Sequence, residues 1–454
     1  MKRMLTVLLA AMLLLTSASA ETLKTFQMYV ENPPVEVKND DAVWYDTAEE
    51  MAGALVAGGF DYDVFYMSPS VDAKVLMEKG YCLDLSPYED LMAHFDRLLP
   101  SIQAQCTLDG KVYALPHIMW TYIICANPAG WEAAGLDIAE APSSMVELLD
   151  FLEDWCVIAE ENPDIPTHVL SYWVSGLYHE GSYVEWLTNL IIESWMVQKE
   201  CAGEPLRFND PALLALLERA EVIGKRLYHA EYVAPDLLAM TPETQNRDFA
   251  QYSLFTEVGG NYFIYETGAP ILYQRIDASQ PALVEAQLDM YAIHAGSSMA
   301  QDAVALLAYV MDTLEEEWAL LLYADAQPLR NEDYESAIST QKARIAALEE
   351  QLKNKELELD VRYELEDELS RRQALLTKQA APENMWRFSA EELAAYQEMA
   401  AGFYYSTPGV LDVSREEGRI LLQLQERFAR GQMTAQAFLQ EVDRMAAMLI
   451  MENQ

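Results

Sequence analysis

Hydrophobic and polar residues follow one another in short blocks that predict alternating strands and helices. Residues 63–67 form a brief apolar run of the length expected for a buried strand, and helical spacing follows over residues 71–79. Strand, small-residue turn and helix together make the repeating unit of an α/β domain. The turn also leaves backbone N–H groups at the start of the helix, beside the end of the strand, where ligands bind in open α/β sheets.

Two capping boxes mark the starts of further helices. Thr47 with Glu50 opens a predicted helix that runs through Val56, and Ser144 with Glu147 opens a second, longer one. The second helix carries apolar residues at helical spacing, which indicates one buried face. These apolar positions are Met145, Leu148, Leu149, Leu152, Trp155, Cys156 and Ala159.

The chain up to residue 311 continues the same alternation. Helical segments dominate residues 183–228, and residues 288–293 predict a strand that leads into a helix ending near Met311. The segment from Thr25 to Val30 is compatible with either a strand or a helix. The pattern therefore predicts an α/β fold class with a helical bias.

Residues 334–379 differ in kind from the rest. Apolar residues recur there at approximately heptad spacing, charged residues fill the other positions, and no Gly or Pro interrupts the segment. One long helix and two antiparallel helices both fit this pattern, but a phase break near Asp360 favours a helical hairpin that turns near residues 358–361. Its charges indicate a solvated face, and the apolar seam is an alternative docking site for a partner helix. Residues 389–453 are predicted to form several amphipathic helices.

The first twenty residues have the features of a cleaved export signal. Lys2 and Arg3 precede an apolar run from Leu5 to Leu15, and Ala18 and Ala20 supply the small residues of a cleavage site. The run is shorter than the ~20 apolar residues needed to span a bilayer. We therefore expect residues 1–20 to be a signal peptide cleaved after Ala20, which makes the mature protein exported, periplasmic or at the cell surface, with no lipid anchor. An N-terminal anchor that stays in place is the less favoured alternative.

Charge and composition narrow the classes of function. The chain has 30 Lys and Arg against 73 Asp and Glu, a formal charge of −43. This balance disfavours nucleic acid and anionic membranes as partners, because binding to either needs clustered basic residues. The five cysteines form no CxxC pair, and the six histidines form no metal-binding motif. We therefore predict no metal, no cofactor and no catalytic residues.

Several segments, taken in order, resemble one known family. Residues 63–86 contain a strand, a helix, a Gly and an Asp-Leu pair, and Asp109 to Pro116 read Asp-Gly-Lys-Val-Tyr-Ala-Leu-Pro. Together they are similar to extracellular solute-binding proteins of family 1, the ligand-capturing subunits of ABC importers. Further matching segments are Asn127, residues 133–136, 143–149, 291–298 and 431–453. Two departures are Cys125-Ala126 in place of a Tyr before Asn127, and Met145 in place of a Trp.

The resemblance implies a two-lobe fold of the periplasmic-binding-protein type with a ligand cleft between the lobes. Residues 21–118 and 285–325 would form lobe 1, and residues 119–284 a helix-rich lobe 2. The hairpin at 334–379 would be an insertion outside the family's core. The C-terminal residues, 385–454, would form helices that pack on the lobes.

The function implied is capture of a small solute, with a carbohydrate favoured, by hinge closure and delivery to the membrane subunits of an ABC permease. Such a protein is a monomeric receptor and not an enzyme. The alternative is a surface interaction or scaffold protein that has lost transport and uses the 334–379 hairpin to dock a partner. An exported hydrolase is disfavoured, because no motif for an activated nucleophile is present.

The candidate ligand-binding residues are aromatic and small polar side chains near the expected cleft. Trp120 follows Pro116 on a strand that, by resemblance, leads between the lobes, and its face is suited to stacking on a sugar ring; core packing is equally compatible. For Ser68 and Ser70 the competing role is helix N-capping. The other candidates lie in loops where interior packing is the competing role, and His117 is a further residue that could reach the cleft. The loop candidates are Tyr172, Trp173, Tyr178 and Tyr262, the last beside Asn261.

Overall fold

The computed structural model of this protein describes most of the chain. The described residues are 22–28, 30–40, 45, 48–57, 59–68, 73–162, 165, 167–170, 181–230, 253–260, 269–354, 359–405 and 416–452. The signal peptide predicted at residues 1–20 lies outside this set. Within it, no helix combines the length and apolar character needed to cross a membrane.

A nine-stranded sheet runs through the whole body of the protein. Its main path is ordered β2-β1-β3-β10-β6-β8-β7, with β13 paired to β10 and β9 paired to β6. Strands β1, β2 and β3 run parallel to one another, whereas β10 is antiparallel to both β3 and β6. The strands are β1 (Leu23–Phe26), β2 (Val37–Asp40), β3 (Val64–Met67), β6 (Ala114–Ala126), β7 (His168–Leu170), β8 (Ser253–Gly260), β9 (Ile271–Leu272), β10 (Val284–Ile293) and β13 (Phe403–Tyr405).

The side chains along this sheet form two hydrophobic cores, which define two lobes. The first lobe packs helices around β1, β3 and the adjoining parts of β6 and β10. Its helices are α2 (Ala48–Val56), α3 (Ala73–Glu78), α4 (Glu89–Phe95), α5 (Pro100–Gln105), α14 (Ala300–Asp312), α15 (Glu316–Leu322) and α18 (Ala390–Ala400). A small hairpin of β4 (Thr107–Leu108) and β5 (Lys111–Val112) precedes β6.

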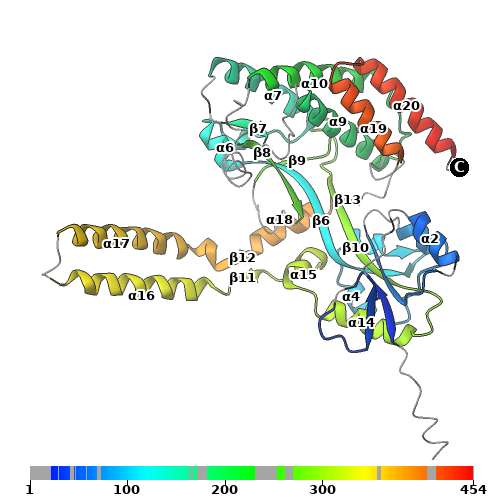
Figure 1. The fold of residues 1–454 in the computed structure, drawn as a ribbon, viewed down its shortest axis with the longest axis horizontal. Helices are drawn as coiled ribbons and strands as arrows, with labels where there is room; N and C mark the ends of the chain where they lie inside the picture. Colours follow the sequence, from blue (N-terminus) through cyan, green and yellow to red (C-terminus); the bar gives the residue numbers. More distant parts are fainter. Residues whose placement is uncertain are drawn as a thin grey trace, which may run out of the picture.

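The second lobe packs a layer of helices on β7, β8 and the far end of β6. Its helices are α6 (Pro128–Ala133), α7 (Met145–Glu161), α9 (Ser182–Cys201), α10 (Pro211–Ala230), α19 (Glu416–Ala429) and α20 (Ala435–Glu452), with a 3₁₀ turn over Ile138–Glu140. Figure 1 shows the two lobes one above the other, with β6 and β10 crossing between them. The C-terminal segments divide between the cores, because α18 and β13 belong to the first and α19 and α20 to the second.

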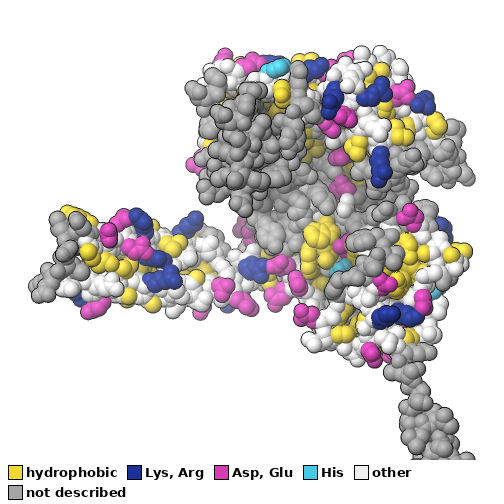
Figure 2. Space-filling model, viewed as in Figure 1, with side chains coloured by type: hydrophobic (Ala, Val, Ile, Leu, Met, Phe, Trp, Pro, Cys, Tyr) yellow, Lys and Arg dark blue, Asp and Glu magenta, His cyan; other side chains and the backbone are white. Residues whose placement is uncertain are grey.

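A helical hairpin projects sideways from this body. Helix α16 (Tyr334–Leu352) packs along α17 (Leu359–Gln379), and a short antiparallel pair of β11 (Leu329–Arg330) and β12 (Trp386–Phe388) ties its base together. A 3₁₀ turn over Pro382–Met385 precedes β12. Only Gln341 and Ile345 of α16 are buried, so the hairpin is a thin, largely solvated arm. Figure 2 shows acidic side chains at the junction of this arm with the lower lobe.

The structure confirms most of the predicted elements. Strand β3, helix α2 and the two-helix form of residues 334–379 are all present, and all seven apolar positions predicted for α7 are buried. Two details differ. Helix α16 ends at Leu352 and α17 begins at Leu359, so residues 359–361 of the predicted turn are helical. The Ser144 hydroxyl accepts from Glu147 N at 3.4 Å, but the Glu147 carboxylate accepts from Ser143, so the capping box is not reciprocal. The ambiguous segment after Thr25 belongs in part to β1.

The packing of α10 against α9 depends on a glycine. A Cβ on Gly224 of α10 would lie 2.7 Å from the backbone nitrogen of Val184 in α9. Gly53 of α2 has no atom within 4 Å of the same position. The absence of a side chain therefore has a packing role at Gly224 and none at Gly53.

We expect Gly224→Ala to lower the free energy of unfolding by about 1–3 kcal/mol, the usual cost of overpacking. Gly53→Ala is the matched control and should raise it by about 0.5–1 kcal/mol, because alanine favours a helix. Urea denaturation followed by circular dichroism measures both changes. Equal effects of the two substitutions would contradict the close approach of α9 and α10.

Candidate functional site

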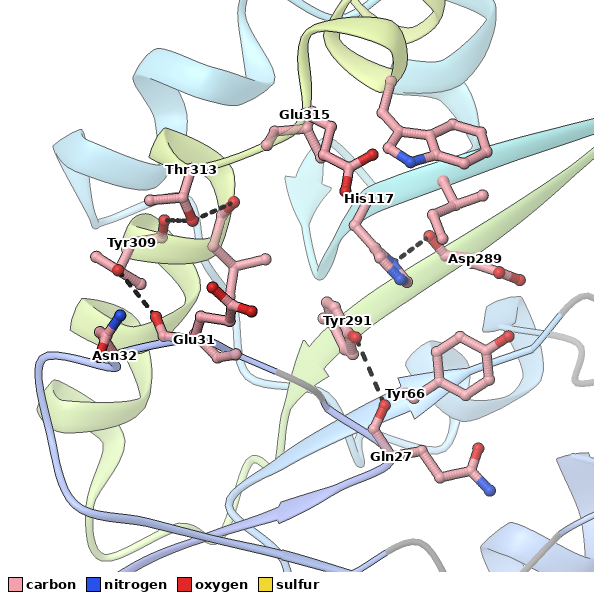
Figure 3. Close-up of a pocket in the computed structure, with 15 residues that line it drawn as sticks. Gln27, Glu31, Asn32, Tyr66, His117, Asp289, Tyr291, Tyr309, Thr313 and Glu315 are labelled. Atoms are coloured by element: carbon pink, nitrogen blue, oxygen red, sulfur yellow. Dashed lines mark hydrogen bonds between the residues drawn. The ribbon is translucent and has the colours of Figure 1, made fainter. Parts of the chain in front are cut away.

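A cavity of about 670 Å³ opens on the first lobe where β1 and β3 end. This is the edge of an α/β sheet at which ligands commonly bind. Its walls come from the turn after β1, from β3, from the crossing strands and from the segment that joins α14 to α15 (Figure 3). The lining residues are Gln27, Val30, Glu31, Asn32, Tyr66, His117, Ile118, Asp289, Tyr291, Tyr309, Val310, Thr313, Leu314, Glu315 and Trp318.

The turn after β1 reaches the cavity through unusual backbone conformations. Gln27 and Asn32 have positive φ angles of 51° and 50°. Non-glycine residues adopt this region rarely and at an energetic cost, so such residues concentrate at functional sites. The Gln27 carbonyl accepts the Tyr291 hydroxyl at 3.5 Å, and the Glu31 carbonyl accepts the Tyr309 hydroxyl at 3.0 Å. These bonds hold the strained turn against β10 and α14.

A β-bulge in the crossing strands shapes the centre of the cavity. Asp289 pairs with Ile118 and Met290 pairs with Pro116, so His117 is an extra residue on β6. A bulge of this kind turns neighbouring side chains toward one face. As a result His117 and Ile118, although consecutive, both line the cavity, together with Asp289 from the opposite strand. Proline has no backbone N–H to donate to the ladder of a sheet. Pro116 is tolerated here because the bulge already interrupts the ladder.

Asp289 is the most deeply buried acidic group at the site. Its side chain is 6% exposed, and its Oδ2 accepts the indole N–H of Trp120 at 2.9 Å. Its Oδ1 is buried. Burial raises the pKa of the Asp289 carboxyl, and hydrogen bonds from Trp120 and the Tyr66 hydroxyl oppose that rise. The carboxyl is therefore part of a buried polar network beside the cavity.

His117 is held as a neutral acceptor. Its Nδ1 lies 3.1 Å from the backbone carbonyl of Asp289, and a carbonyl requires a donor, which assigns the proton to Nδ1. Burial lowers the pKa of His117 to about 4, so the ring is uncharged near neutral pH. The ring stacks on Tyr291 with centroids 4.3 Å apart. Its Nε2 is therefore a lone-pair acceptor in the cavity wall.

Aromatic rings provide most of the apolar surface around these groups. Trp318 meets Trp120 edge to face with ring centroids 5.5 Å apart, and Tyr66 meets His117 at 6.0 Å. Burial, followed by the charge of Asp289, raises the pKa of Tyr66, so its hydroxyl stays protonated. Flat aromatic faces beside hydrogen-bonding groups are the usual composition of a small-molecule site.

The predicted site residues differ in whether they line the cavity. Trp120 is half-buried on β6 and contacts two lining residues, Asp289 and Trp318, without itself lining the cavity. Ser68 directly follows β3 but is not a lining residue, whereas His117 is. Ser70, Tyr172, Trp173, Tyr178, Asn261 and Tyr262 lie outside the described residues. Their binding roles, and that of Trp120, remain predictions.

Several of these candidates follow, in the sequence, strands that end on the side of the second lobe facing the first. Strand β8 ends at Gly260, which pairs with Thr121, the neighbour of Trp120. Strand β7 is parallel to β8, so both strands end on the side of the second lobe that faces the first. Tyr172, Trp173 and Tyr178 follow the end of β7, and Tyr262 follows the end of β8.

Sequence reasoning missed most of the lining residues. Asp289 had the clearest signature, because it is the one charged residue in the predicted apolar strand 288–293. Trp318 and Glu315 follow a helix by a few residues and form no motif. Only the fold brings them to the end of β3.

A second cavity of about 550 Å³ lies between the lobes beside β13. The Tyr404 hydroxyl of β13 donates to Glu200 at the end of α9, 2.5 Å away, which joins the first-lobe sheet to a second-lobe helix. Across the part of the chain that is described, no group of three or more His, Cys, Asp or Glu side chains is arranged to hold a metal ion.

The neutral state of His117 makes stability depend on pH in a defined window. With a pKa near 6.5 when unfolded and about 4 when folded, the unfolded chain binds more protons between these values, so stability falls as pH drops from 6.5 to 4. We expect His117→Gln, which retains a donor for the Asp289 carbonyl, to remove about 3 kcal/mol of this loss. Urea denaturation at both pH values measures it. An unchanged difference between the two pH values in the variant would refute the neutral assignment.

Comparison with known proteins adds the fold relationship. No protein-family model and no curated protein matches the sequence. Solved structures do match over nearly the whole chain. The structure of T. maritima MalE3 with bound maltose has a TM-score of 0.51 at 12% identity, covering 94% of this chain and 99% of that one. A chitin oligosaccharide binding protein has a TM-score of 0.50 at 13% identity, covering 100% and 97%.

A third match is a sugar transporter from Rhizobium etli in an open conformation, with a TM-score of 0.50 at 15% identity and coverage of 94% and 99%. At these identities the similarity establishes the architecture, and the mixed α/β sheet, the two cores and the crossing strands all agree with it. The chain thus has the two-lobe fold of sugar-binding solute receptors, as its resemblance to family 1 solute-binding proteins predicted.

Proposed function

We propose that this protein is an exported receptor that captures a small carbohydrate between its lobes and delivers it to an ABC importer. The observation that carries the proposal is the cavity at the ends of β1 and β3, whose wall combines aromatic rings with hydrogen-bonding side chains. Solved structures with the same fold include proteins named for maltose and chitin oligosaccharides, which supports a solute of this class.

Capture would proceed by closure of the second lobe onto a solute already seated in the first. All lining residues belong to the first lobe or to the crossing strands, so the described wall is one half of a site. A solute that also contacts the second lobe stabilises the closed state by its differential affinity for that state. Strand β6 is the element about which the lobes would hinge, because its residues contribute to both cores, and its pairing partner β10 runs beside it.

The cavity chemistry suits a sugar in two respects. The face of an aromatic ring is complementary to the C–H groups of a pyranose, and Trp318 offers such a face at the cavity wall. Sugar hydroxyls donate hydrogen bonds, and the Glu315 carboxylate and His117 Nε2 on the cavity wall can accept them. Solved structures of the same fold are binding proteins, which supports a receptor without enzymatic activity.

The first test is a panel of mono- and oligosaccharides in isothermal titration calorimetry. We expect at least one to bind reversibly with one site per chain, and Trp318→Ala to weaken that binding at least about tenfold, or about 1.4 kcal/mol, through loss of ring stacking. Tyr363→Ala on the exposed hairpin is the matched aromatic control and should change nothing. Trp318→Phe should restore part of the affinity and shows that the loss is not a folding defect. Absence of binding across the whole panel would refute the carbohydrate function.

The hairpin provides a test against the scaffold alternative. No lining residue of the cavity comes from residues 334–379. Replacement of these residues by a short Gly-Ser linker between β11 and β12 should therefore leave sugar affinity within about twofold of the intact protein. Loss of sugar binding with an unchanged circular dichroism spectrum of the lobes would show that the hairpin is part of the capture machinery.

A further inference from the structure

Charges of opposite sign gather at opposite ends of the projecting arm formed by α16 and α17. Among the described residues, the half of the arm next to the lobes (334–344 and 370–379) carries five basic residues and one acidic residue. The described residues of the outer half (345–354 and 361–369) include six acidic and two basic ones. The arm therefore has a basic base and an acidic tip of similar length.

The register of the two helices places like charges side by side. Arg372 of α17 donates to the side chain of Gln341 in α16, 3.4 Å away, so Lys342 lies level with Arg372. Counting along the antiparallel helices from this contact sets Glu350 level with Glu364. Like charges on adjacent helices repel each other, so this distribution does not stabilise an isolated arm. A second helix with the opposite order of charges would relieve the repulsion.

The dipole of α16 does not account for its charges either. The last turn of α16 carries Glu349 and Glu350 and no basic residue, although a helix dipole favours cations at that end. Lys353, just beyond the helix, pairs with Glu350 at 2.6 Å, but the pair is exposed and such pairs contribute little. The two carboxylates thus oppose the dipole of their own helix as well as the acidic residues of α17.

These charges lie on the exposed outer face of α16. Lys342 and Glu349 are seven residues apart and share this face, with Ala346 between them and Glu350 beside them. All four are exposed, and the other residues of the face are small enough for a second helix to approach closely. Figure 1 shows the arm clear of both lobes for most of its length. The small exposed residues are Ser336, Ser339, Thr340, Ala343 and Ala347.

We propose that the outer face of α16 binds the same face of a second copy of this chain, with the two helices antiparallel. A two-fold axis near Ala346 sets Lys342 of one copy against Glu349 and Glu350 of the other, and symmetry repeats the contact. The basic base of each arm then lies along the acidic tip of the other. A parallel arrangement aligns identical charges and is disfavoured for that reason.

The geometry of the arm also separates the acidic bodies of the two copies. The chain carries a formal charge of −43, so two bodies in close contact would repel each other. Helix α16 has 19 residues and is about 30 Å long, whereas exposed charges are screened beyond about 8 Å at physiological salt. Antiparallel arms hold the bodies at opposite ends. A dimer of this form replaces the monomer that the family resemblance implies.

Sedimentation velocity of the protein without its predicted signal peptide tests the association. We expect a monomer–dimer equilibrium whose dissociation constant rises about tenfold or more between about 0.05 M and about 0.5 M salt, because exposed charges are screened. A protein that stays monomeric up to about 0.2 mM in low salt overturns the proposal. A dimer that persists after residues 334–379 are replaced by a Gly-Ser linker also overturns it.

Charge reversal locates the contact on α16. Lys342→Glu sets like charges against each other in its homodimer, and so does the double variant Glu349→Lys with Glu350→Lys. We expect each variant alone to dimerise about tenfold or more weakly than the intact protein. When the two variants are mixed, opposite charges face each other again at both contacts, so a heterodimer should form with nearly the original affinity.

The heterodimer is measured by labelling one variant with a fluorophore and detecting its sedimentation in the mixture. Its formation shows that both variants are folded and confirms the antiparallel contact. Failure to form, when circular dichroism shows both variants folded, overturns the antiparallel contact. Glu366→Lys on α17 is the matched control, because it reverses an exposed charge in the outer half of the arm away from the outer face of α16. It should change the dissociation constant by less than about threefold, and a loss equal to that of Lys342→Glu overturns the assignment to α16.

Discussion

The antiparallel pairing of β6 with β10 is the constraint on which the rest of the structure depends. Strand β6 contributes to both cores, and together the two strands supply the only sheet continuity, within the described residues, between β3 on one side and β8 on the other. Their register also fixes the cavity, because the bulge between Asp289 and Met290 sets His117 and Asp289 side by side. One local irregularity therefore couples the architecture of the lobes to the chemistry between them.

The site contains features that lower the stability of the ligand-free protein. Around it lie two residues with positive φ, a buried carboxylate and a histidine kept neutral by burial. Each of these costs stability in the ligand-free protein. The cost is tolerated because the flanking first-lobe core is large and continuous. A ligand that recovers part of it gains affinity without any new contact elsewhere.

The projecting hairpin and the body of the protein are stabilised by different interactions. The lobes are held by two broad hydrophobic cores, whereas α16 and α17 hold each other through a narrow seam with Gln341 and Ile345 buried. Several ion pairs on its surface join residues one helical turn apart, such as Arg372 with Glu368. Such pairs contribute about a few tenths of a kcal/mol each. The stability of the arm therefore depends mainly on its own seam and on the antiparallel pair of β11 and β12.

The sequence by itself determined the local elements and, through their order, the fold class. Periodicity placed the buried face of α7 residue by residue and separated the hairpin from the lobes, because burial of a helix face depends on residues three and four apart. Periodicity could not assemble the cavity. Gln27, Tyr66, His117, Asp289 and Trp318 come from five segments spread over almost three hundred residues, and the bulge that aligns two of them arises only when β6 and β10 pair. Contacts between such distant residues are a property of the tertiary structure, since no local pattern records which strand edge a later helix will reach.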